Sequence, residues 1–217
     1  MTFDSEVFQI TVLSLQISAL ATGLSLLIGL PLGTLLSLGK IRGRAFLLSM
    51  VNTGMGLPPV VVGLIVAMML WRSGPLGDLR LIYTPTAIVI AQVIISFPIV
   101  TGLTAAALQS LDPRMKLQLY GLGASRIQMI WRLWREVRLP LLAALMAGFG
   151  SVISEVGASM MVGGNIRFQT RVLTTAIVLE TSKGHFGIAL VLGILLLAIT
   201  FAVNWLLTVI QQRGARR

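Results

Sequence analysis

Several residue types that many functions require are scarce or missing in this chain. Among 217 residues there are no cysteines, one histidine and seven acidic residues. The lack of cysteine excludes a disulfide-bonded scaffold and a zinc or iron–sulfur site held by thiolates. Charged residues make up 11% of the sequence, less than half of the roughly 25% found in ordinary soluble domains. The apolar content of 56% also excludes a disordered chain.

Long uncharged runs dominate what is present, and the mean hydropathy is +0.92. A helix needs about 20 mostly apolar residues to span the hydrocarbon core of a bilayer. Lipid offers the backbone no hydrogen-bond partners, so such apolar runs must be helical. We therefore predict an all-α membrane protein with a single transmembrane domain over residues 1–217. Its five predicted spans lie near residues 10–38, 46–71, 84–108, 139–157 and 187–210.

The positions of the basic residues predict the orientation of the chain. Five spans place the two termini on opposite sides, and cytoplasmic connections carry the excess of Lys and Arg. The acidic start lacks the basic region of a signal peptide, so we expect the first helix to be retained. One side of the membrane would collect five basic residues, namely Arg72, Arg80, Arg167, Arg171 and Lys183. The other side would collect twelve, namely Lys40, Arg42, Arg44, Arg114, Lys116, Arg126, Arg132, Arg135, Arg138, Arg213, Arg216 and Arg217.

The side with twelve basic residues is predicted to be cytoplasmic, which places the N-terminus outside and the C-terminus inside. The net charge of +10 then reflects membrane topology, and we expect no binding to nucleic acid. Two connections are long, residues 109–138 on the cytoplasmic side and residues 155–186 on the outer side. Connections of this length in a compact protein are usually functional or carry structure of their own.

The cytoplasmic connection has the pattern helix, glycine turn, helix. Asp112 followed by Pro113 is a favourable helix start, and the glycines Gly121 and Gly123 permit a left-handed turn. Ser125 can cap a second helix. One apolar stripe is predicted on that helix, formed by Ile127, Ile130, Trp131, Trp134 and Val137. Periodicity leaves two interpretations, a helix lying on anionic membrane lipid and a docking element for a soluble partner.

A resemblance bears on that choice. Gly123-Ala124-Ser125, followed later by Leu139-Pro140, resembles the coupling loop of the membrane subunits of ABC importers. In that family the loop inserts into a groove on the ATP-hydrolysing subunit. The resemblance implies an ATPase-coupling role for Gly121, Gly123, Ala124 and Ser125. The family's Glu-Ala-Ala before the glycine is absent here, and the Leu-Pro lies later than usual, so the family's acidic contact is not carried over.

Two further regions resemble oxyanion importers. Residues 57–63, Leu-Pro-Pro-Val-Val-Val-Gly, are one of them, and three blocks within residues 154–177 are the other. These blocks look like the tungstate-type permeases. The related molybdate permeases typically have Phe and Pro where this chain has Val156 and Thr174. The resembling segments are spread over most of residues 10–210, and they imply a type I ABC importer permease core with a cytoplasmic coupling helix.

The resemblance also implies a function and a set of partners. The chain would be the transmembrane subunit of an ATP-driven importer for a tetrahedral oxyanion in the inner membrane, with tungstate favoured and molybdate or sulfate as alternatives. Its partners would be a second copy of itself, two ATP-binding cassette subunits, membrane lipid, and a periplasmic or lipid-anchored oxyanion-binding protein. The chain itself would hold no cofactor and would not be an enzyme, because the partner ATPase would bind ATP and Mg²⁺.

The outer connection contains an acidic residue at the edge of the fourth span. A carboxylate there is costly unless it is paired, hydrogen-bonded or in water. Glu155 could brace the span, for example against Arg171, or it could form part of an outer gate. The glycines that follow would interrupt the helix, and neutral donors suit an anion that must leave as well as enter. The predicted gate comprises Glu155, Gly157, Ser159, Gly163, Gly164, Asn165, Thr170 and Arg171.

The outer connection also bears on dimer contacts, on metal binding and on an alternative function. In a dimer the two gates would meet at the axis, so Ser159 is expected to lie close to Ser159 of the second copy. No metal site is predicted. The alternative to transport is an intramembrane enzyme that uses Glu155 with His185 or Arg171 as acid–base groups, although such enzymes usually place several polar groups inside the spans.

Overall fold

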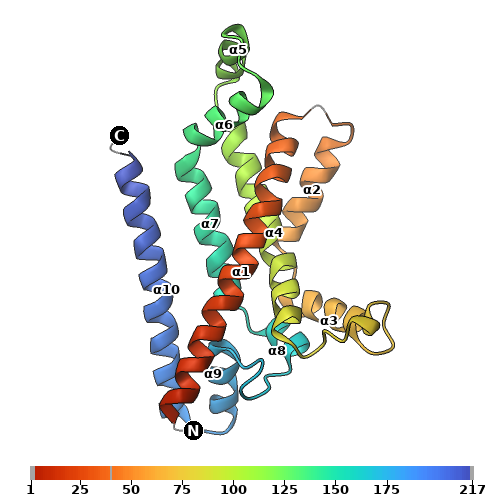
Figure 1. The fold of residues 1–217 in the computed structure, drawn as a ribbon, viewed down its shortest axis with the longest axis vertical. Coiled ribbons are helices and arrows are strands. Elements are labelled where there is room, and N and C mark those ends of the chain that lie inside the picture. Colours follow the sequence, from red (N-terminus) through yellow and green to blue (C-terminus); the bar gives the residue numbers. More distant parts are fainter. Residues whose placement is uncertain (1–2, 40, 216–217) are drawn as a thin grey trace.

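The computed structural model describes residues 3–39 and 41–215, which fold into helices without a strand (Figure 1). Lys40, Arg216 and Arg217, which contribute to the predicted orientation, lie outside the described residues. The elements in chain order are α1 (Phe3–Leu38), α2 (Arg44–Met55), α3 (Pro59–Leu70), the 3-10 turn η1 (Gly77–Leu79), α4 (Pro85–Gln109), α5 (Pro113–Gly121), α6 (Arg126–Glu136), α7 (Arg138–Ile153), α8 (Gly157–Gly163), α9 (Leu173–Ser182) and α10 (Phe186–Ala215).

The centre of the bundle is built from α1, α4 and α7, which pack along one another (Figure 1). Small residues allow α1 and α4 to approach closely, as in membrane helix pairs generally. A Cβ atom on Gly33 would lie 2.6 Å from the carbonyl oxygen of Thr101. α2 packs on α4, and α10 packs on α9 and α7. The α5–α6 segment protrudes from one end of the bundle, and α8 and α9 lie at the other end (Figure 1).

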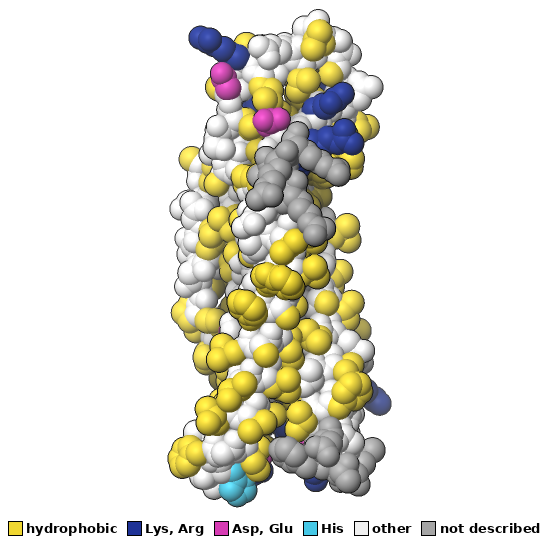
Figure 2. Space-filling view, turned by 90° about the vertical axis from the view of Figure 1, so that its left-hand side faces the viewer, with side chains coloured by type: hydrophobic (Ala, Val, Ile, Leu, Met, Phe, Trp, Pro, Cys, Tyr) yellow, Lys and Arg dark blue, Asp and Glu magenta, His cyan; other side chains and the backbone are white. Residues whose placement is uncertain are grey.

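Three helices, α1, α4 and α10, are long and apolar enough to cross a membrane. Two bent pairs raise the number to as many as five if each pair is one span: α2 with α3, bent by 99°, and α6 with α7, bent by 73°. Apolar side chains cover the length of the molecule, and charged ones gather at its ends, mostly around α5 and α6 (Figure 2). An apolar surface of this extent requires lipid or protein around it.

Three predicted spans differ from the structure. Residues 46–71 do not form one straight helix, because Pro58 and Pro59 lack amide donors and the residue before a proline disfavours helical backbone. α2 therefore ends at Met55, and a new helix starts at Pro59 in another direction. The fourth predicted span, residues 139–157, ends early at Ile153, and Gly157 starts the separate helix α8. The first helix begins at Phe3, well before residue 10.

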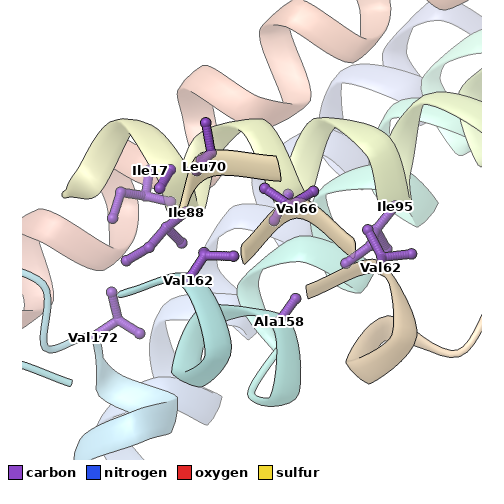
Figure 3. Packing of buried hydrophobic residues seen from close by; sticks show 11 residues of the cluster. Ile17, Val62, Val66, Leu70, Ile88, Ile95, Ala158, Val162 and Val172 are labelled. Atoms are coloured by element: carbon purple, nitrogen blue, oxygen red, sulfur yellow. The ribbon is translucent and has the colours of Figure 1, made fainter. Parts of the chain in front are cut away.

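The core at the α8 end fixes the position of α8. Val62 and Val66 of α3, Ile88 of α4, and Ala158 and Val162 of α8 are all buried in one cluster. Figure 3 shows these side chains pointing toward one another between the three helices. α8 is thus held between α3 and α4 by apolar packing, although its seven residues are too few to form a stable helix alone.

Candidate functional site

The α5–α6 segment adopts the predicted helix–turn–helix. Asp112 caps α5, because its carboxylate accepts a hydrogen bond of 2.8 Å from the backbone N–H of Arg114. α5 ends at Gly121, and Gly123 has a φ of +75°, in the left-handed region that favours glycine. Ser125 caps α6 as expected and forms a reciprocal capping box with Gln128, with bonds of 3.4 and 2.9 Å. The turn is therefore well defined by local bonds.

α6 packs on the bundle by a face that overlaps only part of the predicted apolar stripe. Met129, Leu133 and Val137 are buried in a cluster with Leu108 of α4. The indole N–H of Trp134 donates a 2.9 Å hydrogen bond to the hydroxyl of Thr34 on α1. The predicted stripe is therefore divided between two environments, because Val137 is buried against the bundle whereas Ile127 and Trp131 face outward.

Apolar side chains therefore face away from the bundle at this end. We call them the knob surface: Leu117 (70% exposed), Tyr120 (53%), Leu122 (83%), Ile127 (81%) and Trp131 (56%). The guanidinium of Arg135 lies 5.6 Å from the centre of the Trp131 ring, a cation–π distance. Exposed apolar patches with polar rims are typical of interaction sites. Gly121, Gly123, Ala124 and Ser125, the predicted coupling residues, form the turn that presents this surface.

At the other end, Glu155 is 9% exposed and acts as a cap. Its Oε1 accepts a 2.9 Å bond from the backbone N–H of Ala158, at the start of α8. Its carbonyl oxygen accepts a 2.9 Å bond from the hydroxyl of Thr174 on α9. The predicted pairing of Glu155 with Arg171 is wrong, because Arg171 binds the carboxylate of Glu6 at 3.0 Å. Glu155 therefore joins α7, α8 and α9 without a cationic partner among the described residues.

The predicted neutral donors are bonded within the outer loop. Thr170 is 1% exposed, and its hydroxyl donates to the carbonyl of Gly163 and accepts a 2.9 Å bond from the N–H of Ile166. The amide of Asn165 donates to the carbonyl of Thr175 at 3.4 Å. In this conformation the O–H of Thr170 and one N–H of the Asn165 amide are used within the protomer, so a gate built from these side chains would have to break these bonds in order to open.

Ser159 lies inside the protomer. Its side chain is 1% exposed, and its hydroxyl accepts a 3.3 Å bond from the amide of Gln92 on α4. A cysteine at this position could not reach the second copy unless α8 moved, which corrects the expectation that Ser159 lies at the protomer surface. Met160 and Met161 are the α8 residues with exposed side chains, at 37% and 38%.

At two of the predicted gate glycines, α8 lies very close to the neighbouring helices α3 and α4. A Cβ atom on Gly157 would lie 2.5 Å from the side chain of Val60 on α3, and one on Gly163 would lie 2.7 Å from that of Ile88 on α4. Gly164 ends α8 in the left-handed conformation, with a φ of +69°. The helix was predicted to break after Glu155, at these glycines; it ends slightly earlier, at Ile153, and Gly157 instead begins α8. Gly157 and Gly163 let α8 fit between its neighbours.

Ion pairs at this end were not found from the sequence. Glu6 at the start of α1 binds both Arg167 and Arg171, so it ties the first helix to the outer loop. The sequence hinted at this pairing only in that the acidic N-terminal segment and the two arginines were predicted to lie on the same side of the membrane. Separately, Glu180 binds Lys183 and His185, each at 2.8 Å. The hydrogen bond from Lys183, followed by that from His185, lowers the pKa of the Glu180 carboxyl.

These pairs bear on the alternative of an intramembrane enzyme. His185 lies beside Glu180, and Arg171 lies beside Glu6, so neither pairs with Glu155. The acid–base pair on which the enzyme alternative depends is therefore not assembled. Among residues 3–39 and 41–215, no cluster of three or more His, Asp or Glu side chains could hold a metal ion.

Known proteins resemble this chain over nearly its full length. The tungstate uptake system permease protein TupB of Peptoclostridium acidaminophilum is 38% identical over 97% of this chain and 92% of that protein. A probable anion ABC transporter permease protein of Haloferax volcanii is 39% identical over 90% of this chain and 86% of its own length. The molybdenum transport system permease protein ModB of Escherichia coli K12 is 29% identical over 96% of this chain and 97% of that protein.

The fold is also known. An inward-facing structure of the MetNI methionine ABC transporter has a chain that superposes with a TM-score of 0.76, covering 99% of each chain at 16% identity. The relatives above are named as permeases, which are transport subunits and not enzymes. Residues 25–216 match the family described as the binding-protein-dependent transport system inner membrane component. With a match over most of its length, a shared fold and permease relatives, this chain belongs to that family of inner membrane transport proteins.

Proposed function

We propose that this chain is the membrane-spanning subunit of an ATP-driven importer for a tetrahedral oxyanion, with tungstate as the first candidate. The observation that carries the proposal is the 38% identity to a tungstate uptake permease over 97% of the chain. A second tungstate permease, from Campylobacter jejuni, is 33% identical over 77% of the chain. Molybdate and sulfate are the alternatives, since permeases named for them are less similar, at 29% and at 25–27% identity.

The proposed topology has five spans, with α2–α3 and α6–α7 each counted as one bent span. The N-terminus is outside and the C-terminus inside, as the excess of basic residues around the α5–α6 end supports. In this orientation α5 and α6 lie in the cytoplasm and α8 and α9 at the outer surface. Five spans from one chain form half of a pathway, and a second copy supplies the other half.

The knob surface is the proposed docking site for an ATP-binding cassette subunit. Its apolar side chains are unfavourably placed in water, and docking in a groove would bury them. The knob is also held rigidly, because the cap at Ser125 fixes the turn and Trp134 ties α6 to α1. Movement of the ATPase would therefore be transmitted through α6 to α7, whose far end adjoins Glu155 and α8.

The proposed outer gate is α8 with the loop after it. Glu155 fixes the start of α8, and Thr170 fixes its end through the carbonyl of Gly163. Opening would release Thr170 and Asn165 from their partners within the loop, and these neutral donors could then bind a passing anion. Weak, neutral contacts of this kind suit conduction, which requires release as well as binding. Arg167, 59% exposed at the mouth, would attract the anion electrostatically.

Transport by the reconstituted system tests the proposal. Proteoliposomes that contain this chain, the ATPase and the binding protein should take up tungstate only when ATP is supplied. At equal concentrations, uptake of tungstate should exceed that of molybdate and of sulfate. Preference for molybdate or sulfate would select the corresponding alternative, and failure to transport any of the three anions would refute the proposed substrate class.

Cysteine cross-linking tests whether α8 lies at the dimer axis. Met160→Cys, at a position that is 37% exposed, should form an intersubunit disulfide in the outward-closed state. The two Cα atoms must approach to about 4.4–6.8 Å for this bond to form. Ser159→Cys is the matched control, because Ser159 is 1% exposed and should not cross-link. A Met160→Cys variant that stays monomeric under oxidation in every nucleotide state would place α8 away from the axis.

A further inference from the structure

A small cavity lies at the junction between α7 and α8, inside a single protomer. Its polar lining comprises Ser14 and Ser18 of α1, Gln92 of α4, Glu155, and Thr174 of α9, and Val152 and Ile153 add the C-terminal end of α7. The space available to the centre of a water-sized sphere is about 10 Å³, which is room for one such particle. The packing, coupling and gating described above make no use of this space.

Two of the hydroxyl donors in the lining are already used, because Ser14 donates to the carbonyl of Ile10 and Thr174 donates to that of Glu155. Gln92 is 3% exposed, and its Oε1 is buried without a hydrogen-bond partner. The orientation of this amide is fixed, since its Nε2 donates to the carbonyl of Val152 at 3.4 Å and to the hydroxyl of Ser159 at 3.3 Å. A buried acceptor left without a partner costs about 1–3 kcal/mol. An occupant that satisfies Oε1 is therefore favoured.

The charges around the cavity also favour a positively charged occupant. Glu155 is 9% exposed and uses one oxygen to cap α8, and no Lys, Arg or His lines the cavity. The described charged groups near the outer ends of α1 and α9 are paired, since Arg167 and Arg171 bind Glu6, and Lys183 and His185 bind Glu180. α3, α4 and α8 carry no titratable side chain. The carbonyl end of α7, which bears partial negative charge, also faces the cavity.

We propose that this cavity binds one small monovalent metal cation, of the size of Na⁺, between the Glu155 carboxylate and Gln92 Oε1. The hydroxyl groups of Ser14 and Ser18 are further oxygen ligands within the lining. Broken helices in membrane transporters coordinate such ions with the carbonyl ends of half-helices, and the α7–α8 junction supplies this arrangement. One carboxylate and room for one particle argue against Ca²⁺, which takes 6–8 oxygen ligands, and against Mg²⁺, which keeps several waters.

Cation binding would hold the junction between α7 and α8 in one conformation. The cation would link α1, α4 and α7 at the point where Glu155 positions α8. Its role is independent of the transported anion, so the site can be tested without the ATPase, the binding protein or the oxyanion.

Thermal unfolding of the purified full-length chain in detergent tests this proposal. At constant ionic strength, replacing N-methylglucamine chloride by about 150 mM NaCl should raise the Tm by roughly 2–4 °C in a saturable manner. KCl should have a smaller effect, because the smaller Na⁺ approaches the Glu155 carboxylate more closely and is attracted to it more strongly. Glu155→Gln keeps an oxygen that can cap α8 but removes the charge, and it should abolish the response to Na⁺.

Two further variants keep the test decisive. Ser18→Ala removes one oxygen ligand and should shift the Na⁺ response to higher concentrations, which gives a second measurement if Glu155→Gln does not fold. Glu180→Gln removes an acidic residue away from the cavity, and it should respond to Na⁺ like the unaltered chain. A Tm that is insensitive to Na⁺, or that responds only to pH, would overturn the proposal in favour of a buried water or a proton. Equal responses to Na⁺ in the unaltered chain and in Glu155→Gln would also overturn it.

Discussion

Replacing Gly123 by valine should abolish the stimulation of ATP hydrolysis by the loaded binding protein, while the chain still inserts into the membrane. Gly123 has a φ of +75°, and nothing lies within 4 Å of the place where its Cβ would be. Steric contact with neighbours is therefore irrelevant, and the whole effect comes from the backbone. A non-glycine residue pays about 1–2 kcal/mol in the left-handed region, and a β-branched one more, so the turn would rearrange.

A rearranged turn would displace the knob surface relative to the ATPase. Leu122 and Ile127, the two most exposed members of that surface, lie on either side of Gly123. The measurement is ATPase activity of the reconstituted complex, with and without the loaded binding protein, alongside membrane insertion and the Tm of the variant.

Gly121 supplies the matched control. It also has open space around its Cβ position, but its φ lies outside the left-handed region, since it is the last residue of α5. Gly121→Ala should therefore retain stimulated ATPase activity. Full stimulation in Gly123→Val would show that the turn is not the energy-coupling contact. Equal loss in both variants would mean that any added side chain at the tip is disruptive, and that the backbone argument is wrong.

The features predicted well from the sequence are those fixed by local chemistry. The start of α5 at Pro113, the left-handed Gly123 and the cap at Ser125 each depend on residues within a few positions of one another. Capping and turn formation follow from side-chain oxygens, proline and glycine in fixed relative positions. The apolar composition of α1, α4 and α10 was similarly sufficient to predict helices that are long and apolar enough to cross a membrane.

The features predicted poorly depend on tertiary packing. The lack of charged residues identified residues 46–71 as an apolar segment. It did not indicate that the helices on either side of Pro58 and Pro59 run in different directions. On α6, two apolar faces compete for the bundle. Met129 and Leu133 are buried and Ile127 is exposed because of where α1, α4 and α7 end. Periodicity cannot choose between faces when both are apolar.

The outer site shows a related limit. The resemblance to oxyanion permeases drew attention to Glu155 and Ser159, but it said nothing of which way their side chains point. Glu155 faces the interior because it caps α8, and Ser159 is held by Gln92, a residue 67 positions away in the sequence. The partner of Arg171 is still more distant, since Glu6 lies 165 positions earlier in the sequence. Contacts over such separations are set by the fold and not by local pattern.

Replacing Gly63 by leucine is expected to displace α8 and to stop transport. Gly63 lies in α3, where α8 crosses it, and a Cβ atom there would lie 2.6 Å from the Cα atom of Ala158 and 3.1 Å from the Cβ atom of Met161. The first of these is a backbone atom, which cannot move aside as a flexible side chain can. Overpacking of this kind costs roughly 1–3 kcal/mol. Because Glu155 and Thr170 fix both ends of α8, the strain would reach the proposed gate directly.

Two measurements on Gly63→Leu separate these effects. Thermal unfolding reports the disturbed packing of α3 on α8, and oxyanion uptake reports the loss of transport. Gly193→Leu is the control, since Gly193 lies in α10 with nothing within 4 Å of its Cβ position. That variant should keep both its Tm and its transport, because the added side chain meets open space on a lipid-facing helix. A Gly63→Leu variant with unchanged Tm and unchanged uptake would contradict the close packing of α3 on α8. A lowered Tm with normal uptake would support the close packing of α3 on α8 but would show that α8 is not part of the transport pathway.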